Sequence, residues 1–442
     1  MSNYADKGAE SAKREQAFAH VDKARLGWLH LRAVIMSGVK FFADAYDIFV
    51  IGPAIPIIYQ VYYSGYASTN WENLIGQIGF GILGDKLGRW KMYGVELIIM
   101  IVCTIGSALA APMKNGWSIL IILSMWRFVL GIGIGGDCPM SAVITSEFAN
   151  VRYRVMLLSA VFAMQGIGIM VGGIVFIATL AGMKSQIQAD YTVLDQVWRI
   201  ALGFGVVPAI GAVYFRLTIP ETPRFTVDVI GDTQKADSDV LKVLQMNSVA
   251  NVGSNWEGQD VATAKVVVKT NTFSDFTAYF GQWRNMKTII GTAYCWFALD
   301  VAWYGLSLNQ STVLNLINFN GPAKVTIALG NLIIAFCGTV PGYWFYVPHV
   351  EKLGRKPIQY FGFFAISALP FPFLVIFTIA QFFFQFGPNT TTLVVPGEVV
   401  GPFLNDNAQL VLIVFAFIIA TGGTANWESL EELSGQDDVI LA

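Results

Sequence analysis

The sequence predicts an all-α membrane protein, and three observations support this prediction. Of the 442 residues, 55% are hydrophobic and only 13% are charged, whereas a soluble globular protein carries about 25% charged residues. Apolar runs recur along the chain, many of them near the length of about 20 residues that a helix needs to cross the hydrocarbon core. Lysine and arginine gather in alternate loops between the runs, as they do in cytosolic loops. This pattern excludes a soluble enzyme.

The apolar runs predict ten spans, six before a polar insert and the rest after it. The second span is short, because Glu72 and Asp85 bound its uncharged part. The ninth run is long for one span and short for two spans with a loop, so the count is ten or eleven. The predicted spans are residues 33–62, 72–84, 92–112, 117–144, 156–182, 197–219, 287–308, 325–347, 358–398 and 407–425.

The polar insert divides the chain into two helical bundles. It is too hydrophilic to enter lipid, and the N-terminal tail lacks the basic, apolar and cleavage-site order of a secretory signal. We therefore expect both in the cytosol. The expected parts are a tail at 1–32, a first bundle at 33–219, a cytosolic loop at 220–286, an incomplete second bundle at 287–425 and a C-terminal tail at 426–442.

A short loop pattern recurs in both halves and indicates an internal repeat. An acidic residue is followed after two positions by glycine, then arginine, and glycine permits a tight turn there. A chance turn with anchoring charges is the alternative interpretation. The paired halves resemble the major facilitator superfamily, in which two pseudo-symmetric six-helix bundles rock around a central site. The loop residues are Gly81, Asp85, Gly88 and Arg89 after the second span, and Glu351, Gly354 and Arg355 after the eighth.

Several ionisable side chains lie inside predicted spans, where each costs roughly 2.5 to 3.5 kcal/mol. This cost makes them candidates for function. They are Lys40, Asp44 and Asp47 in the first span, Glu96 in the third, Arg127 and Asp137 in the fourth, and Asp300 in the seventh.

Some of these charges have possible structural partners. Glu96 can pair with Arg127, and Lys40 can neutralise Asp44 one helical turn away. Asp47 lies on a different helix face from Asp44 and can line a helix interface.

Asp137 and Asp300 have no basic residue one turn away, and their neighbours are apolar. Because a low dielectric disfavours the charged form of a carboxyl group, such residues can exchange a proton near neutral pH. Glycines crowd the span before Asp137, but no strand precedes them as a dinucleotide loop requires. Close helix packing explains them better, and Pro139 can break the helix beside Asp137.

The segment around Asp137 reads Gly135-Gly136-Asp137-x-Pro139-x-Ser141-Ala-x-Ile-Thr-Ser-Glu147. It resembles the signature of the phosphate:proton symporters of fungi and plants, and residues 41–47, 220–225, 381–391 and 429–435 agree with the same family. The resemblance implies a plasma-membrane importer of inorganic phosphate driven by protons. It implies a monomeric functional unit, no cofactor and no metal.

The resemblance also implies which residues contact phosphate. Trp296, Asp300 and Tyr304 are spaced four residues apart and so share one helix face. Gln165 and Asn389 can donate and accept hydrogen bonds, and a carboxylate can accept one from the hydroxyl of dihydrogen phosphate. Ordinary packing is the alternative for the two aromatic residues. The expected phosphate-binding residues are thus Gln165, Trp296, Asp300, Tyr304 and Asn389.

Proton coupling is expected at Asp44 and Asp137, with Glu96 and Arg127 as charged neighbours. The chain departs from the family at Cys138, where a phosphate-contacting tyrosine is expected, and after residue 398, where a helix carrying a lysine is expected. The second half therefore lacks one or two helices in this interpretation.

Two alternatives remain open, a phosphate receptor on a transporter scaffold and a carrier of another oxyanion or a glycerophosphodiester. An enzyme is not expected, because the chain has no nucleophile and base pair or phosphate-binding loop. The four cysteines form no metal or disulfide pattern. A net charge of −2 without a basic block argues against nucleic acid as a partner.

Overall fold

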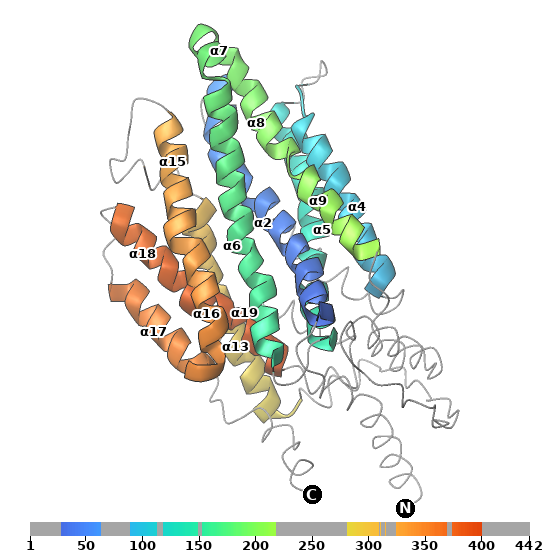
Figure 1. Cartoon of the computed structure of the whole chain (residues 1–442), viewed down its shortest axis with the longest axis vertical. Helices are drawn as coiled ribbons and strands as arrows, with labels where there is room; N and C mark the ends of the chain where they lie inside the picture. The colour runs from blue at the N-terminus through green and yellow to red at the C-terminus, as the bar shows by residue number, and fades with distance from the viewer. Residues whose placement is uncertain are drawn as a thin grey trace, which may run out of the picture.

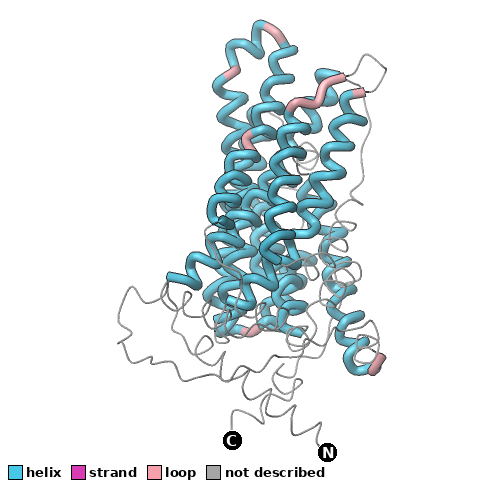
Figure 2. The backbone as a smooth tube through the Cα atoms, turned by 90° about the vertical axis from the view of Figure 1, so that its right-hand side faces the viewer, coloured by secondary structure: helices cyan, strands magenta, loops and turns pink. Residues whose placement is uncertain are grey.

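Helices account for the regular structure in the part of the chain that the structure describes. The computed structural model describes residues 28–62, 89–112, 118–148, 153–217, 281–308, 310, 314, 324–368 and 374–399. Most of the helices run side by side along the long axis of the molecule (Figure 1), and Figure 2 shows helix but no strand in these residues. Lipid cannot satisfy backbone N–H and C=O groups, so apolar segments of this length fold as helices.

The first half is built around α2 and α6, which pack closely against each other. α2 also contacts α5, α8 and α9, and α4 lies against α5, α8 and α9. A Cβ atom on Gly168 of α6 would collide with the backbone carbonyl of Phe42 on α2, so glycine is needed where these helices meet. The helices of this half are α2 (Trp28–Tyr62), α4 (Arg89–Ala108), α5 (Ile119–Phe148), α6 (Arg154–Gly182), α7 (Lys184–Ala189), α8 (Leu194–Gly203) and α9 (Val206–Leu217).

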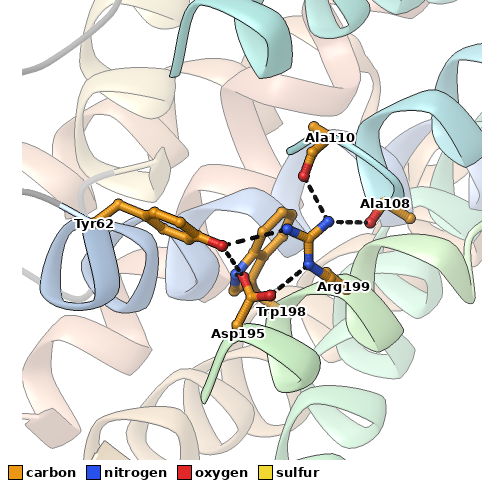
Figure 3. Close-up of polar contacts among 6 residues, drawn as sticks. All are labelled: Tyr62, Ala108, Ala110, Asp195, Trp198 and Arg199. Carbon is orange, nitrogen blue, oxygen red and sulfur yellow. Dashed lines mark hydrogen bonds and ion pairs between the residues drawn. The ribbon is translucent and has the colours of Figure 1, made fainter. Parts of the chain in front are cut away.

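A polar network joins the ends of three helices of the first half (Figure 3). Arg199 of α8 donates to Asp195 Oδ2 at 2.8 Å and to two backbone carbonyls, that of Ala108, the last residue of α4, and that of Ala110 just beyond it. Tyr62, at the end of α2, donates to Asp195 Oδ1 at 2.8 Å. Arg199 thus satisfies carbonyls that the end of α4 leaves without helical partners.

The second half contains two helices that are interrupted by π-helical turns. α15 continues through η4 into α16, and α18 continues through η5 into α19. Gly354, the glycine of the repeated loop pattern, lies between α16 and α17 with φ +80°, a conformation that favours glycine. The elements are α13 (Trp283–Leu308), α15 (Lys324–Ile334), η4 (Ala335–Thr339), α16 (Val340–Leu353), α17 (Arg355–Ala368), α18 (Leu374–Phe384), η5 (Gln385–Asn389) and α19 (Thr390–Val399).

The long run 358–398 forms two helical segments. α17 has 14 residues, and only residues 369–373 separate it from α18. This stretch contains Pro370 and Pro372, and proline cannot continue a helical hydrogen-bond ladder. The sequence left one or two segments open here, and the described residues of the run form two.

The predicted sixth span is divided at Phe204 and Gly205 into α8 and α9. By length and apolarity, Arg154–Gly182, Leu194–Tyr214 and Thr326–Leu353 are each able to cross a membrane within the described residues. The predicted spans 72–84 and 407–425, residues 1–27 of the N-terminal tail, the C-terminal tail, residues 220–280 of the insert, and Gly81, Asp85 and Gly88 lie outside the described residues. The rest of the predicted N-terminal tail, residues 28–32, forms the first residues of α2.

The two halves meet mainly along α6. This helix packs against α15, η4, α16 and α19, and Figure 1 shows it between the orange helices of the second half and the rest of the first half. One apolar cluster contains residues of both halves, among them Phe162 of α6, Trp296 of α13 and Tyr343 of α16. The interface is therefore apolar around a few polar groups.

We predict that Gly168→Val destabilises the protein, because the added side chain meets the Phe42 carbonyl. Overpacking of this kind costs about 1 to 3 kcal/mol, so the thermal unfolding midpoint of the purified protein should fall. Gly211→Ala on α9 is the matched control, since no atom lies within 4 Å of a Cβ at this position. An unchanged midpoint in Gly168→Val would contradict the close contact of α2 and α6.

Candidate functional site

A buried polar cluster joins the two halves at the centre of the interface. Asn389 of η5 donates through Nδ2 to Tyr343 Oη at 2.8 Å and to Gln385 Oε1 at 2.6 Å. Tyr343 donates in turn to Gln165 Oε1 on α6, at 3.4 Å. All four side chains are buried. Two of the predicted phosphate ligands, Gln165 and Asn389, therefore lie on either side of one hydroxyl group.

The position of Asn389 depends on the π-helical turn η5. Pro388 lies inside this turn and has no N–H to donate, and π-helical turns occur often at functional sites. The buried Thr390 hydroxyl bonds to the Gln385 carbonyl at 2.6 Å, and the Thr392 hydroxyl bonds to the Asn389 carbonyl at 2.9 Å. These hydroxyls satisfy carbonyls around the irregular turn, where lipid offers no donor.

Close helix contacts also hold η5 and Tyr343 in place. A Cβ on Gly362 of α17 would lie 2.7 Å from the Cα of Gly387 in η5. A Cβ on Gly166 of α6 would lie 2.8 Å from Cδ2 of Tyr343. The Phe162 ring meets the Tyr343 ring edge-on, with centroids 5.5 Å apart, an arrangement that aromatic pairs favour. The phenol therefore fits against α6 only because residue 166 has no side chain.

Of the three predicted phosphate ligands on α13, the structure describes the side chain of one, Trp296. Trp296 is buried and belongs to the same apolar cluster as Tyr343. Asp300 and Tyr304 follow on the same continuous helix, as their spacing predicts, and their side chains lie outside the described residues. The side chain of Asp137 on α5 lies outside them as well.

A fully buried ion pair lies within the first half. Lys40 Nζ of α2 is 3.1 Å from Glu96 Oε2 of α4, and both side chains have no exposed surface. The sequence suggested Arg127 as the partner of Glu96 and Asp44 as the partner of Lys40. The structure adds the pairing of Lys40 with Glu96, two residues that lie 56 positions apart in the sequence and on different helices. Asp44 is also buried.

Arg127 of α5 lies beside Asp47, one of the ionisable residues of the first span, for which the sequence left a place at a helix interface as the alternative to function. Arg127 Nη2 donates to the Asp47 backbone carbonyl at 2.6 Å, and Thr104 Oγ1 donates to Asp47 Oδ2 at 2.9 Å. A Cβ on Gly205 would collide with Asp47 Oδ1, so the break between α8 and α9 lies directly against this carboxyl group. The sequence signal for Asp47 is its position directly before the uncharged run 48–71.

Asp47 has no exposed surface, and its Oδ1 has no hydrogen-bond partner among the described residues. A buried carboxyl group with a free oxygen can accept a proton, and a nearby guanidinium can stabilise it when the proton leaves. The first half therefore contains buried groups that can exchange charge, and the interface contains neutral groups that can bind a solute. These features define a transporter of two helical bundles.

Comparison with known proteins agrees with this class. The family model of the Sugar (and other) transporter matches residues 33–428. The chain therefore belongs to this family of membrane transporters.

Curated relatives cover most of the chain. The repressible high-affinity phosphate permease of Neurospora crassa is 39% identical over 430 residues, which are 88% of this chain and 75% of the permease. The inorganic phosphate transporter PHO84 of Saccharomyces cerevisiae is 39% identical over 432 residues, which are 87% of this chain and 73% of that protein.

Solved structures support the fold. A double-tryptophan mutant of XylE has a TM-score of 0.63 at 16% identity, over 88% of this chain and 86% of that chain. The Major Facilitator Superfamily transporter FucP, in its outward conformation, has a TM-score of 0.51 at 14% identity, over 89% and 90%. The chain has the all-helical fold of this superfamily, as the repeated loop pattern predicted.

We predict that Lys40→Met destabilises the protein more than the double variant Lys40→Met, Glu96→Met. The single change removes the cation at 3.1 Å from a buried carboxylate, and breaking such a pair costs about 3 to 5 kcal/mol. The double change removes both charges, and well-packed apolar replacements are often tolerated. Thermal unfolding of the purified variants measures the difference. Equal midpoints for the two would show that the pair is not coupled.

Proposed function

We propose that the chain imports inorganic phosphate together with protons by alternating access of its two helical bundles. The names of the curated relatives support phosphate as the substrate. The observation that supports the proposal best is the polar cluster between α6 and η5, because Gln165 and Asn389 come from different halves and share one hydroxyl partner. A solute bound there contacts both bundles, as a central carrier site requires.

The proposed phosphate ligands are Gln165, Trp296, Asp300, Tyr304 and Asn389. Amide, indole and phenol groups all donate hydrogen bonds to phosphate oxygens. If Asp300 contacts phosphate, either the anion or the carboxyl group of Asp300 has to carry a proton, because two deprotonated groups would repel each other. The binding of phosphate and of a proton would then depend on each other at the same place.

The proposed proton route uses Asp44 and Asp137, with Glu96 and Arg127 as charged neighbours. Two contacts support charge exchange in this region. Glu96 is paired with Lys40 on α2, and Arg127 bonds to the backbone of α2 at Asp47. We add Asp47 to the proposed route because its free carboxyl oxygen lies in the same buried region.

The proposal includes the finer architecture. The second bundle would lack one or two helices, and the second span would be short. The proposed boundaries are 1–32, 33–219, 220–286, 287–425 and 426–442, with the tail and central loop in the cytosol. The proposed location is the plasma membrane, with a monomer as the functional unit.

We predict that the purified full chain, reconstituted into vesicles, accumulates radiolabelled phosphate when the proton gradient is directed inward. Dissipating the gradient with a protonophore should abolish accumulation, because the gradient is the proposed energy source. Sulfate and glycerophosphate in excess should compete weakly. Binding without accumulation would instead indicate a receptor, and strong competition by another anion would indicate a different substrate.

We predict that Asp137→Asn abolishes gradient-driven accumulation, because asparagine cannot carry a proton. Phosphate exchange between equal concentrations on both sides should persist, since it needs no net proton movement. Asp190→Asn is the control. Asp190 lies in the exposed connection between α7 and α8, where hydrogen bonds from Thr192 hold the pKa of its carboxyl group below the usual range. Undiminished accumulation by Asp137→Asn would remove Asp137 from the proton route.

A further inference from the structure

We propose that Tyr343 and Gln385 are two further phosphate ligands of this chain. The proposal rests on the proposed function, because it extends the same site. Both side chains have no exposed surface, and both are bonded directly to Asn389. Neither belongs to the ligand set that the sequence indicates.

The hydroxyl of Tyr343 lies between the two proposed ligands Gln165 and Asn389. It is 2.8 Å from Asn389 Nδ2 and 3.4 Å from Gln165 Oε1. An anion that contacts both amides therefore lies beside this hydroxyl. The bond to Gln165 is long for an O–H donor, whose usual distance is about 2.7 to 2.8 Å. The Tyr343 proton can thus turn from Gln165 to a phosphate oxygen at little cost.

The amide of Gln385 offers a second donor beside the same group. Its Oε1 accepts from Asn389 at 2.6 Å, and this bond fixes which end of the amide faces Asn389. Its Nε2 is buried and has no hydrogen-bond partner among the described residues. A buried donor without an acceptor is costly. A phosphate oxygen held by Asn389 would supply the acceptor that Gln385 lacks.

The chemistry of these groups fits a small oxyanion. Phosphate presents mainly acceptor oxygens, and Tyr343 O–H and the unpartnered Gln385 N–H are donors. Asn389 donates both of its N–H groups, to Tyr343 and to Gln385, so it has to give up one of these bonds to contact the anion. These donors are neutral, so they bind an anion without a permanent ion pair.

The test compares phosphate affinity in four variants of the purified full chain. Tyr343→Phe removes the hydroxyl and keeps the ring, and Gln385→Leu removes the amide. Tyr346→Phe is the control on α16, because Tyr346 is equally buried one turn further along. Gln381→Leu is the control on α18, where Gln381 is buried one turn before Gln385. Thermal unfolding shows which variants are folded.

We expect Tyr343→Phe and Gln385→Leu each to weaken the binding of radiolabelled phosphate by about 10- to 100-fold, the effect of losing a hydrogen bond to a charged ligand. The controls should bind as the unmodified chain does.

Each result has a definite meaning. Wild-type affinity in Tyr343→Phe and in Gln385→Leu overturns this inference while leaving the proposed function intact. Equal losses in the controls also overturn it, since packing would then explain the effect. If the unmodified chain binds no phosphate, the proposed function fails and this inference fails with it.

Discussion

Lipid offers no hydrogen-bond partner to a polar group, so each polar atom in a spanning helix needs a partner inside the protein. This constraint accounts for the arrangement of the first half. Lys40 is brought against Glu96, and Arg127 reaches the backbone of Asp47. In the second half the hydroxyls of Thr390 and Thr392 cover the carbonyls of η5. The irregular turn that carries Asn389 is tolerated only because its own neighbours supply the missing bonds.

The contacts between the halves differ in kind from the ion pair within the first half. The rings of Phe162 and Tyr343 meet across the interface, and the bond from Tyr343 to Gln165 is long and neutral. Within the first half, Lys40 and Glu96 form a buried ion pair, and removing one partner of such a pair leaves a buried charge uncompensated. Phe162, Tyr343 and Gln165 are uncharged, so parting these contacts leaves no charge of theirs unpaired. A carrier whose two bundles move against each other needs contacts of this kind between them.

The sequence predicted the helices well, because the length of an apolar run is a local property. Side-chain partners depend on tertiary packing, so the pairing of Lys40 with Glu96 across 56 residues could not be read from spacing along one helix. Tyr343 lies in an apolar aromatic run that looks like ordinary packing, and only the fold brings its hydroxyl between Gln165 and Asn389. The number of helical segments in the run 358–398 was ambiguous, since the length of an apolar run alone does not say how many helices it contains. The structure has α17 and α18 there.

On the proposed function, the groups that handle protons and phosphate lie on elements that touch. α2 carries Asp44 and Asp47, and α6 carries Gln165. The two helices meet with the Phe42 carbonyl against Gly168, one turn from Gln165. Closely packed elements transmit displacement because no space absorbs it. A shift of α2 when a buried carboxyl group gains or loses a proton therefore reaches Gln165, and through it the hydroxyl of Tyr343. On this proposal Gln165, Tyr343 and Asn389 are neutral, so these three ligands would release the anion once the contact with α6 changes, with no ion pair to break.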